Sequence, residues 1–213
     1  MGRLSSKNRS IPHPLLRFAP ESLGLTEFPR SFFHQDTAYI ARRLLGAWLA
    51  RRFKGQWYGG RIVETEAYLG SGDAAAHSRG GRRTPRIEPM YMDGGHLYVF
   101  LVYGMHHCTN VVTRPAGIAE AVLLRAAEGP QGIPIKLLSG PAKLSSGLGI
   151  TVAASGTDLL SAGNLRLFHN GNRCSSIGTT RRIGVDYAAE AAEWPLRFFD
   201  RRSAAVSGPA GLK

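Results

Sequence analysis

Apolar and polar residues alternate along several segments in the middle of the chain, and this two-residue period predicts β-strands. The connections between them are short and mostly contain glycine, so neighbouring strands are expected to run antiparallel. Lys54-Gly55-Gln56 joins the first two as a hairpin. The predicted strands span residues 47–53, 57–68, 97–103, 106–113, 119–125 and 195–199.

Helical spacing of apolar residues appears between these strands. One helix is predicted to begin near Asp36, a favourable N-cap residue, and to stop at Gly46. A second begins in Ser139-Gly-Pro-Ala-Lys143, where ordinary helix capping and a phosphate site at the free amides and Lys143 are both compatible with the residues. A third covers residues 187–194. The rest of 126–143 is expected to be irregular, and 151–180 to be loop with short strands.

These elements predict an α+β fold, mixed α and β, with one domain built on a curved antiparallel sheet flanked by short helices. A chain of 213 residues is long enough for one substantial core, and no internal repeat divides it. The expected organisation is a basic, mobile arm over residues 1–30, a domain over 31–200 and a tail over 201–213. The arm is either simply solvated or adds nonspecific phosphate contacts.

Candidate chemistry begins on the strand at 57–68, where two glutamates alternate in Arg61-Ile-Val-Glu-Thr-Glu-Ala-Tyr-Leu-Gly70. Their carboxylates would be roughly 6.5–7 Å apart along the backbone, close enough to influence each other. Either both lie on a solvated face and pair with arginines, or they take part in chemistry. Strict alternation places Ile62, Glu64, Glu66 and Tyr68 on one face, and Arg61, Val63, Thr65, Ala67 and Leu69 on the other.

A small-residue, basic loop follows this strand directly and places His77 among four arginines, Arg79, Arg82, Arg83 and Arg86. On the later strands, alternation puts Cys108 and Asn110 on one face, and Leu123 and Arg125 on one face. Tyr103 is expected at a hairpin tip before Gly104. There it is either a wedge for nucleic acid or an ordinary sheet-edge aromatic.

Charge narrows the classes of partner. The chain has 27 Lys and Arg against 15 Asp and Glu, a formal net charge of +12. Such a field concentrates polyanions, and nucleic acid is the commonest of them. No apolar run is long enough to cross a bilayer, and no secretory signal is recognised. With two distant cysteines, a disulfide framework is not expected, and a cytoplasmic or, in a eukaryote, nuclear location is favoured over secretion.

Several site classes are not supported by motif. His106-His107-Cys108 lacks the spacing of a tetrahedral metal set, because adjacent strand residues point to opposite faces. No G-x-S-x-G, P-loop or G-x-G-x-x-G motif is present. What remains is a carboxylate on a strand with aromatic, histidine and arginine neighbours.

Six segments together closely resemble the alkyladenine (3-methyladenine) DNA glycosylase family, over about residues 32–200. They are Arg61-Ile-Val-Glu-Thr-Glu-Ala-Tyr-Leu-Gly, Ala75-Ala-His-Ser-Arg-Gly-Gly-Arg-Arg-Thr-Pro-Arg, Leu97-Tyr-Val-Phe-Leu-Val-Tyr-Gly-Met, Ala121-Val-Leu-Leu-Arg, Ser139-Gly-Pro-Ala-Lys-Leu, and Arg182-Ile-Gly-Val with Pro195-Leu-Arg-Phe.

This resemblance implies a monofunctional enzyme that flips alkylated or deaminated purines out of duplex DNA and hydrolyses the N-glycosidic bond, without metal or organic cofactor. Glu66 would activate the water, and Arg125 would help to hold the water and the nucleotide. Tyr103 would fill the gap left in the duplex. The base pocket would contain Tyr68, His77, Phe100, Asn110 and Leu123. The protein is expected to act on double-stranded DNA as a monomer, without membrane contact and without lyase activity.

The chain departs from the family pattern at two places. Phe100 replaces a frequent tyrosine, which keeps stacking but removes a hydroxyl. The region from 128 to 139 is shorter than the helical segment of many relatives, so DNA contacts there are expected to be reduced. Glu64 matches the family motif but is assigned a structural salt bridge.

Two other functions are compatible with parts of the sequence. One is a basic nucleic-acid-binding module that keeps the fold without the chemistry. The other is a hydrolase of free nucleosides, which would have no use for the positive field and whose activity would hardly respond to salt.

Overall fold

The computed structural model describes residues 11–130, 135–161 and 163–208. Most of its strands form one strongly curved sheet in the order β2-β8-β3-β4-β7-β6-β5, with every pairing antiparallel. The strands are β1 (Arg17–Phe18), β2 (Thr26–Glu27), β3 (Trp48–Phe53), β4 (Gln56–Tyr68), β5 (Leu97–Val102), β6 (His106–Thr113), β7 (Glu120–Glu128), β8 (Leu165–His169), β9 (Ile177–Thr180) and β10 (Arg197–Asp200).

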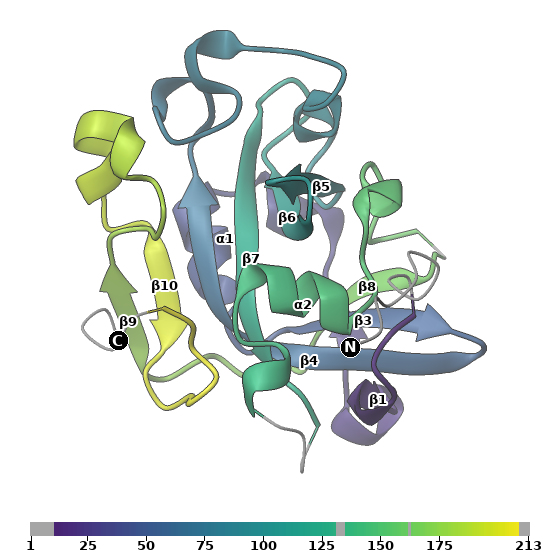
Figure 1. Cartoon of the computed structure of the whole chain (residues 1–213). Coiled ribbons are helices and arrows are strands. Elements are labelled where there is room, and N and C mark those ends of the chain that lie inside the picture. The colour runs from purple at the N-terminus through teal and green to yellow at the C-terminus, as the bar shows by residue number, and fades with distance from the viewer. Residues whose placement is uncertain (1–10, 131–134, 162, 209–213) are drawn as a thin grey trace, which may run out of the picture.

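Short helices flank this sheet, as the sequence predicts, and the α+β fold is confirmed. α1 (Thr37–Arg43) and α2 (Pro141–Gly147) lie on opposite faces of the sheet (Figure 1). The 3₁₀ segments are η2 (Pro14–Leu16), η3 (Glu21–Leu23), η4 (Arg30–His34), η5 (Gly70–Gly72), η6 (Arg79–Gly81), η7 (Glu88–Tyr91), η8 (Ile135–Leu137), η9 (Val152–Ala154) and η10 (Asp186–Glu193).

The long strand β4 organises the sheet. Its first half pairs with β3, and its second half lies between β7 and β10. α1 begins at Asp36, whose side chain accepts a hydrogen bond from the Tyr39 amide, and it buries Ile40 and Ala41 in the main core. The second half of β4 is thus supported on both edges, which makes it a rigid platform for side chains on its other face.

The predicted alternation along β4 is wrong for Ile62 and Val63. The pairing of β4 with β7 shifts register on both sides of Glu64, and Val63 on β4 and Arg125 on β7 fall at these shifts. A β-bulge reverses the side to which the following residues point. Ile62 therefore joins Ala67 in the main core, and Val63 packs in a separate cluster with Phe199. Glu64, Glu66 and Tyr68 share contacts on the other face.

Other element boundaries also differ from the sequence prediction. β7 continues to Glu128, so the chain is not irregular from 126 onward. The helix expected at 187–194 is the 3₁₀ segment η10. Part of the shortened 128–139 connection, residues 131–134, lies outside the described residues.

Both ends of the chain take part in the fold further than expected. Within the predicted arm, β1 pairs with β4, and Leu16 and Phe28 are buried. Residues 1–10 of that arm lie outside the described residues. Within the predicted tail, Ala205, Val206 and Ser207 are buried beside β4 and β10. Burial of these segments follows from the sheet edge and the cluster around Val63 that they cover.

Candidate active site

A cavity of about 480 Å³ opens on the face of the sheet that carries α2, within the usual size range of ligand pockets. Seven of the eight site residues expected from the resemblance line it. They are Tyr68, His77, Phe100, Tyr103, Asn110, Leu123 and Arg125. Glu66 does not line the cavity, because it is fully buried one layer behind the wall.

The pairing register explains why distant residues meet there. Glu66 on β4 lies opposite Leu123 on β7, Leu123 lies opposite Asn110 on β6, and Asn110 lies opposite Tyr98 on β5. Residues directly opposite each other on neighbouring antiparallel strands point to the same face. The floor of the cavity is therefore one row of side chains, Leu123, Asn110 and Tyr98, and Glu66 continues this row behind the wall.

Three groups of the cavity wall hold the Glu66 carboxylate. The Tyr68 hydroxyl donates to Oε2 at 2.9 Å, the Ile183 amide donates to Oε1 at 2.8 Å, and Arg125 Nη1 is 3.2 Å from Oε1. Burial, together with the charge and hydrogen bond of Glu66, raises the pKa of Tyr68 well above its ordinary value. The Tyr68 hydroxyl therefore stays protonated and orients the carboxylate toward the cavity wall.

Glu64 lies in buried ion pairs, which agrees with the salt bridge predicted for it. Its Oε1 accepts hydrogen bonds from Arg125 Nε at 2.8 Å and Arg197 Nε at 2.7 Å, and its Oε2 accepts the Ser207 amide at 2.7 Å. Burial opposes ionisation of Glu64, but the two guanidinium charges and these hydrogen bonds outweigh it and lower its pKa. Glu64 thereby fixes the guanidinium that reaches Glu66.

His77, Tyr98 and Phe100 form an aromatic wall. His77 Nδ1 is 2.8 Å from the Tyr98 hydroxyl, and the His77 and Phe100 rings meet edge to face with centroids 4.5 Å apart. Burial, and then the charges of Arg86, Arg79 and Arg82, lower the pKa of His77 to about 4. The imidazole is consequently neutral at pH 7, and the N–H of a neutral imidazole is a weak acid.

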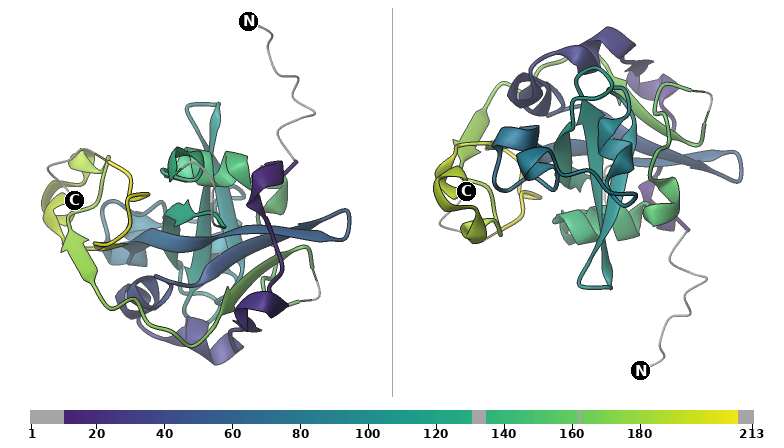
Figure 2. Two further views of the ribbon diagram at one scale, coloured as in Figure 1. Left: turned by 90° about the horizontal axis from the view of Figure 1, so that it is seen from below. Right: turned by 90° about the horizontal axis from the view of Figure 1, so that it is seen from above.

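Asn110 lies in the floor of the cavity, and Tyr103 lies at its entrance. Asn110 is buried, and its Nδ2 donates to the Tyr98 carbonyl at 3.0 Å, which anchors the amide in the floor. Tyr103 stands at the tip of the β5–β6 hairpin, as expected, with 88% of its surface exposed and a φ of 50°. This hairpin projects away from the rest of the molecule on the side of α2 (Figure 2). An exposed ring therefore borders the entrance.

The segment Arg182-Ile-Gly-Val matches the family pattern, but no role is predicted for it from the sequence. Arg182 is buried, pairs through both terminal nitrogens with Asp73, and lies 4.8 Å over the Tyr68 ring. Ile183, Gly184, Val185 and Tyr187 line the cavity. The wall thus comes partly from a segment far from β4 in sequence, and local patterns on β4 carry no sign of it.

The composition of the described residues bears on two other kinds of site. These residues contain no cluster of three or more His, Cys, Asp or Glu side chains that could hold a metal ion. Among the helices described, none has the length and apolar character required to span a membrane.

A buried carboxylate thus lies behind a cavity with aromatic walls, and an exposed tyrosine stands at the entrance. The sequence pattern of the methylpurine-DNA glycosylase (MPG) family matches residues 31–204, and the chain belongs to this family. The resemblance noted in the sequence is thereby confirmed.

Three bacterial relatives, each named "Putative 3-methyladenine DNA glycosylase", illustrate the similarity. A protein of Desulfitobacterium hafniense is 43% identical over 197 residues, covering 84% of this chain and 97% of its own. A protein of Bacillus thuringiensis is 43% identical over 192 residues, covering 80% and 94%. One of Bdellovibrio bacteriovorus is 43% identical over 187 residues, covering 84% and 97%.

Proposed function

We propose that this protein is a monofunctional DNA glycosylase that removes alkylated or deaminated purines from duplex DNA and so initiates base excision repair. The observation that carries the proposal is the Glu66 carboxylate, held by Tyr68, Ile183 and Arg125 directly behind an aromatic cavity. The family and the names of the relatives support the same class of reaction.

The cavity wall suits a damaged purine turned out of the helix. Tyr68, His77 and Phe100 offer ring faces and edges, so a purine alkylated at N3 or N7 gains cation–π attraction that a neutral base does not. Asn110 in the floor is positioned to test the edge of the base. Phe100 keeps the stacking surface and lacks a hydroxyl, so discrimination at that wall rests on shape and ring contact.

In this mechanism Glu66 acts on a water that enters the wall beside Tyr68 and Arg125, because the carboxylate itself does not line the cavity. The carboxylate accepts a proton as the water oxygen bonds to C1′ of the sugar, the N-glycosidic bond breaks, and its electron pair leaves with the base. Arg125 helps to hold the water and the nucleotide through its contact with Glu66. A cationic base leaves without further protonation. A neutral base needs a proton, and a pKa of about 4 makes His77 a poor source at pH 7, which favours water.

The proposal also covers the exposed tyrosine and the state in which the protein acts. Tyr103 fills the space that the flipped nucleotide leaves in the duplex, and the protein acts as a monomer inside the cell. None of the lysines in the described ranges lines the cavity, which supports hydrolysis by water rather than a Schiff base with strand cleavage.

The decisive variant is Glu66→Gln, which keeps the size of the side chain and removes the carboxylate that accepts the proton. Duplexes carrying 3-methyladenine, ethenoadenine or hypoxanthine are incubated with excess enzyme, and abasic sites are scored. The wild type should release at least one of these bases, and Glu66→Gln should lower the single-turnover rate by about 10²–10⁴-fold while lesion DNA still binds. Glu27→Gln, on β2 and paired with Arg166, is the matched control and should keep full activity.

Two results would reject this function. If the wild type binds duplexes and releases no base, the protein is a binding module. If it instead cleaves free nucleosides at a rate independent of salt, it is a nucleoside hydrolase.

A further inference from the structure

Tyr187 is a large aromatic residue of the cavity that the proposed mechanism does not use. It lines the cavity, and 65% of its surface is exposed. Of the large apolar or aromatic residues described as exposed, only Tyr103 and Tyr187 also line this cavity. Its exposure therefore marks the cavity entrance.

The position of Tyr187 is restrained at both ends. Its hydroxyl donates to the Ala75 carbonyl at 3.3 Å, in the loop that leads to His77. Its backbone belongs to η10, whose Ala188, Ala191 and Ala192 pack with Val185 and Ala75 in a small buried cluster. The ring is thus presented to solvent on a fixed support, and a fixed exposed ring loses little conformational entropy on binding.

The segment that carries Tyr187 is also connected to the catalytic groups. Arg182 stacks on Tyr68, and the Ile183 amide donates to Glu66. Tyr187 follows Ile183 by four residues, and both residues line the cavity. η10 and the β5–β6 hairpin are separate segments of the fold (Figure 2), and each contributes one exposed tyrosine to the cavity.

Charge indicates what the Tyr187 ring would contact. The preceding residue, Asp186, is exposed, and Glu190 and Glu193 on the same segment are exposed as well. Arg181 pairs with Glu193 at 2.9 Å and lies 4.0 Å from Asp186, so it offsets one of these three negative charges. A phosphate is disfavoured beside the negative charge that remains. An uncharged part of a nucleotide, its sugar or its base, suits the ring face.

We propose that Tyr187 contacts the flipped nucleotide at the cavity entrance and shields it from solvent, which makes it a specificity-determining residue. This inference rests on the proposed function. The flipped nucleotide enters the cavity past the Tyr187 ring, so the contact favours the flipped state over undamaged duplex.

The test compares Tyr187→Ala and Tyr187→Phe in the Glu66→Gln background, so that binding is measured without turnover. Affinities are determined for a duplex with ethenoadenine and for the same duplex with adenine, and 2-aminopurine beside the lesion reports base flipping. Tyr187→Ala should lower the ratio of the two affinities by about tenfold, the usual range for loss of one ring contact with a base, and should reduce the fluorescence change. Tyr187→Phe should retain the ratio within about twofold, because the ring carries the contact.

The matched control is Tyr39→Ala, which removes a partly exposed tyrosine on α1, on the opposite face of the sheet. It should leave the affinity ratio unchanged. Thermal unfolding of each variant verifies that the fold is intact.

Equal losses for both duplexes, or an unchanged ratio, would overturn the role of Tyr187. Failure of the wild type to release any base would contradict the proposed function instead. Since the binding comparison needs no turnover, it decides the role of Tyr187 in either case.

Discussion

At the scale of single residues, the site depends on a balance of buried charges. Glu64 and Glu66 face Arg125 and Arg197, and all four side chains are buried. Desolvation of an ion costs several kcal/mol, and a buried partner compensates it only while both are present. Each member of this group therefore stabilises the others, and the position of Arg125 beside Glu66 is a property of the whole group.

Glu64→Gln tests this balance. The substitution leaves Arg125 and Arg197 without the carboxylate that both contact, so the free energy of unfolding should fall by about 3–5 kcal/mol. Urea unfolding monitored by tryptophan fluorescence measures the change. Glu27→Gln removes a carboxylate whose side chain is 42% exposed and should change stability by less than about 1 kcal/mol. Equal effects of the two substitutions would show that burial of the ion pairs contributes nothing.

The depressed pKa of His77 gives a second prediction, for stability against pH. The folded protein binds the His77 proton only near pH 4, whereas the unfolded chain binds it near the ordinary value of 6.5. The stabilisation is therefore complete above pH 6.5 and is lost as the pH falls toward 4. Between pH 7 and pH 5, the wild type should lose on the order of 1 kcal/mol more stability than His77→Gln. Parallel pH profiles of the two proteins would contradict the neutral imidazole.

At the scale of elements, the hairpin β5–β6 presents Tyr103 in a backbone conformation that suits glycine. Tyr103 has a φ of 50° and 88% exposure, so its ring contributes little to folding. Tyr103→Gly should leave stability unchanged or raise it by up to about 1 kcal/mol. The same substitution should lower excision from duplex DNA by about tenfold and spare excision from single strands, because a single strand has no stack to fill.

Single-turnover assays on both substrates, with thermal unfolding alongside, measure these effects. Tyr39→Ala serves again as the control. Equal losses on single and double strands would assign Tyr103 to base binding instead.

The same scale shows what sequence can and cannot predict. Helical spacing with an N-cap residue, period-two patterns and turn residues are all local, and they identified α1, the β3–β4 hairpin and the three-strand meander. The bulge at Glu64 was not predicted from the sequence, because Val63 and Ile62 are both apolar and either residue suits a core face. The family resemblance predicted seven of the residues that line the cavity. No role was predicted for Tyr187, because its proposed role arises from the packing of η10 against the Ala75 loop. This is a contact between residues 112 apart in the chain.

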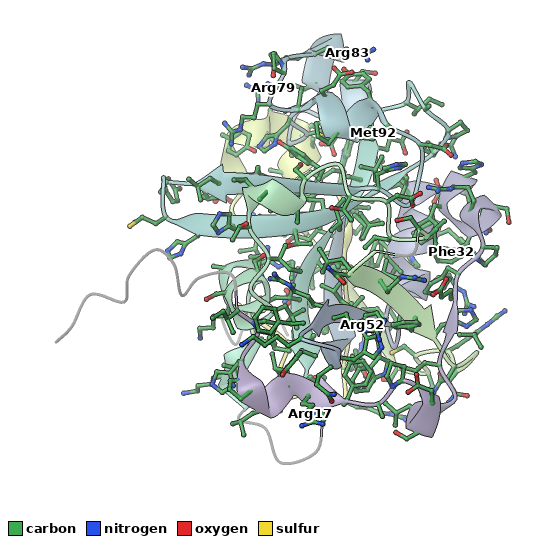
Figure 3. All side chains as sticks on the ribbon, turned by 90° about the vertical axis from the view of Figure 1, so that its right-hand side faces the viewer. Arg17, Phe32, Arg52, Arg79, Arg83 and Met92 are labelled. Carbon is green, nitrogen blue, oxygen red and sulfur yellow. The ribbon has the colours of Figure 1, made fainter. Side chains whose placement is uncertain are left out.

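At the scale of the whole molecule, the net charge of +12 is spread over the surface and is not confined to the site. Figure 3 shows Arg79 and Arg83 at one end of the molecule and Arg17 and Arg52 toward the other. Arg79 belongs to the loop that follows His77, and Arg83 pairs with Glu88 through two hydrogen bonds. Only cations beside a bound duplex release counterions, so the total charge overstates the binding charge.

Salt dependence separates these contributions. If the duplex crosses the cavity beside the 79–86 loop, neutralising about five phosphates, the logarithm of the DNA association constant should fall with the logarithm of salt concentration with a slope near about −4.5. Arg79→Gln should reduce the magnitude of that slope by about 1, whereas Arg52→Gln, an exposed arginine toward the other end, should leave it unchanged. Fluorescence anisotropy with undamaged duplex from 50 to 200 mM salt measures both, while the single-turnover rate at saturating enzyme should be insensitive to salt. An equal reduction of the slope for the two variants would mean that the positive charge of the protein attracts DNA diffusely. No defined phosphate would then lie beside the 79–86 loop, and the duplex would approach the cavity from another side.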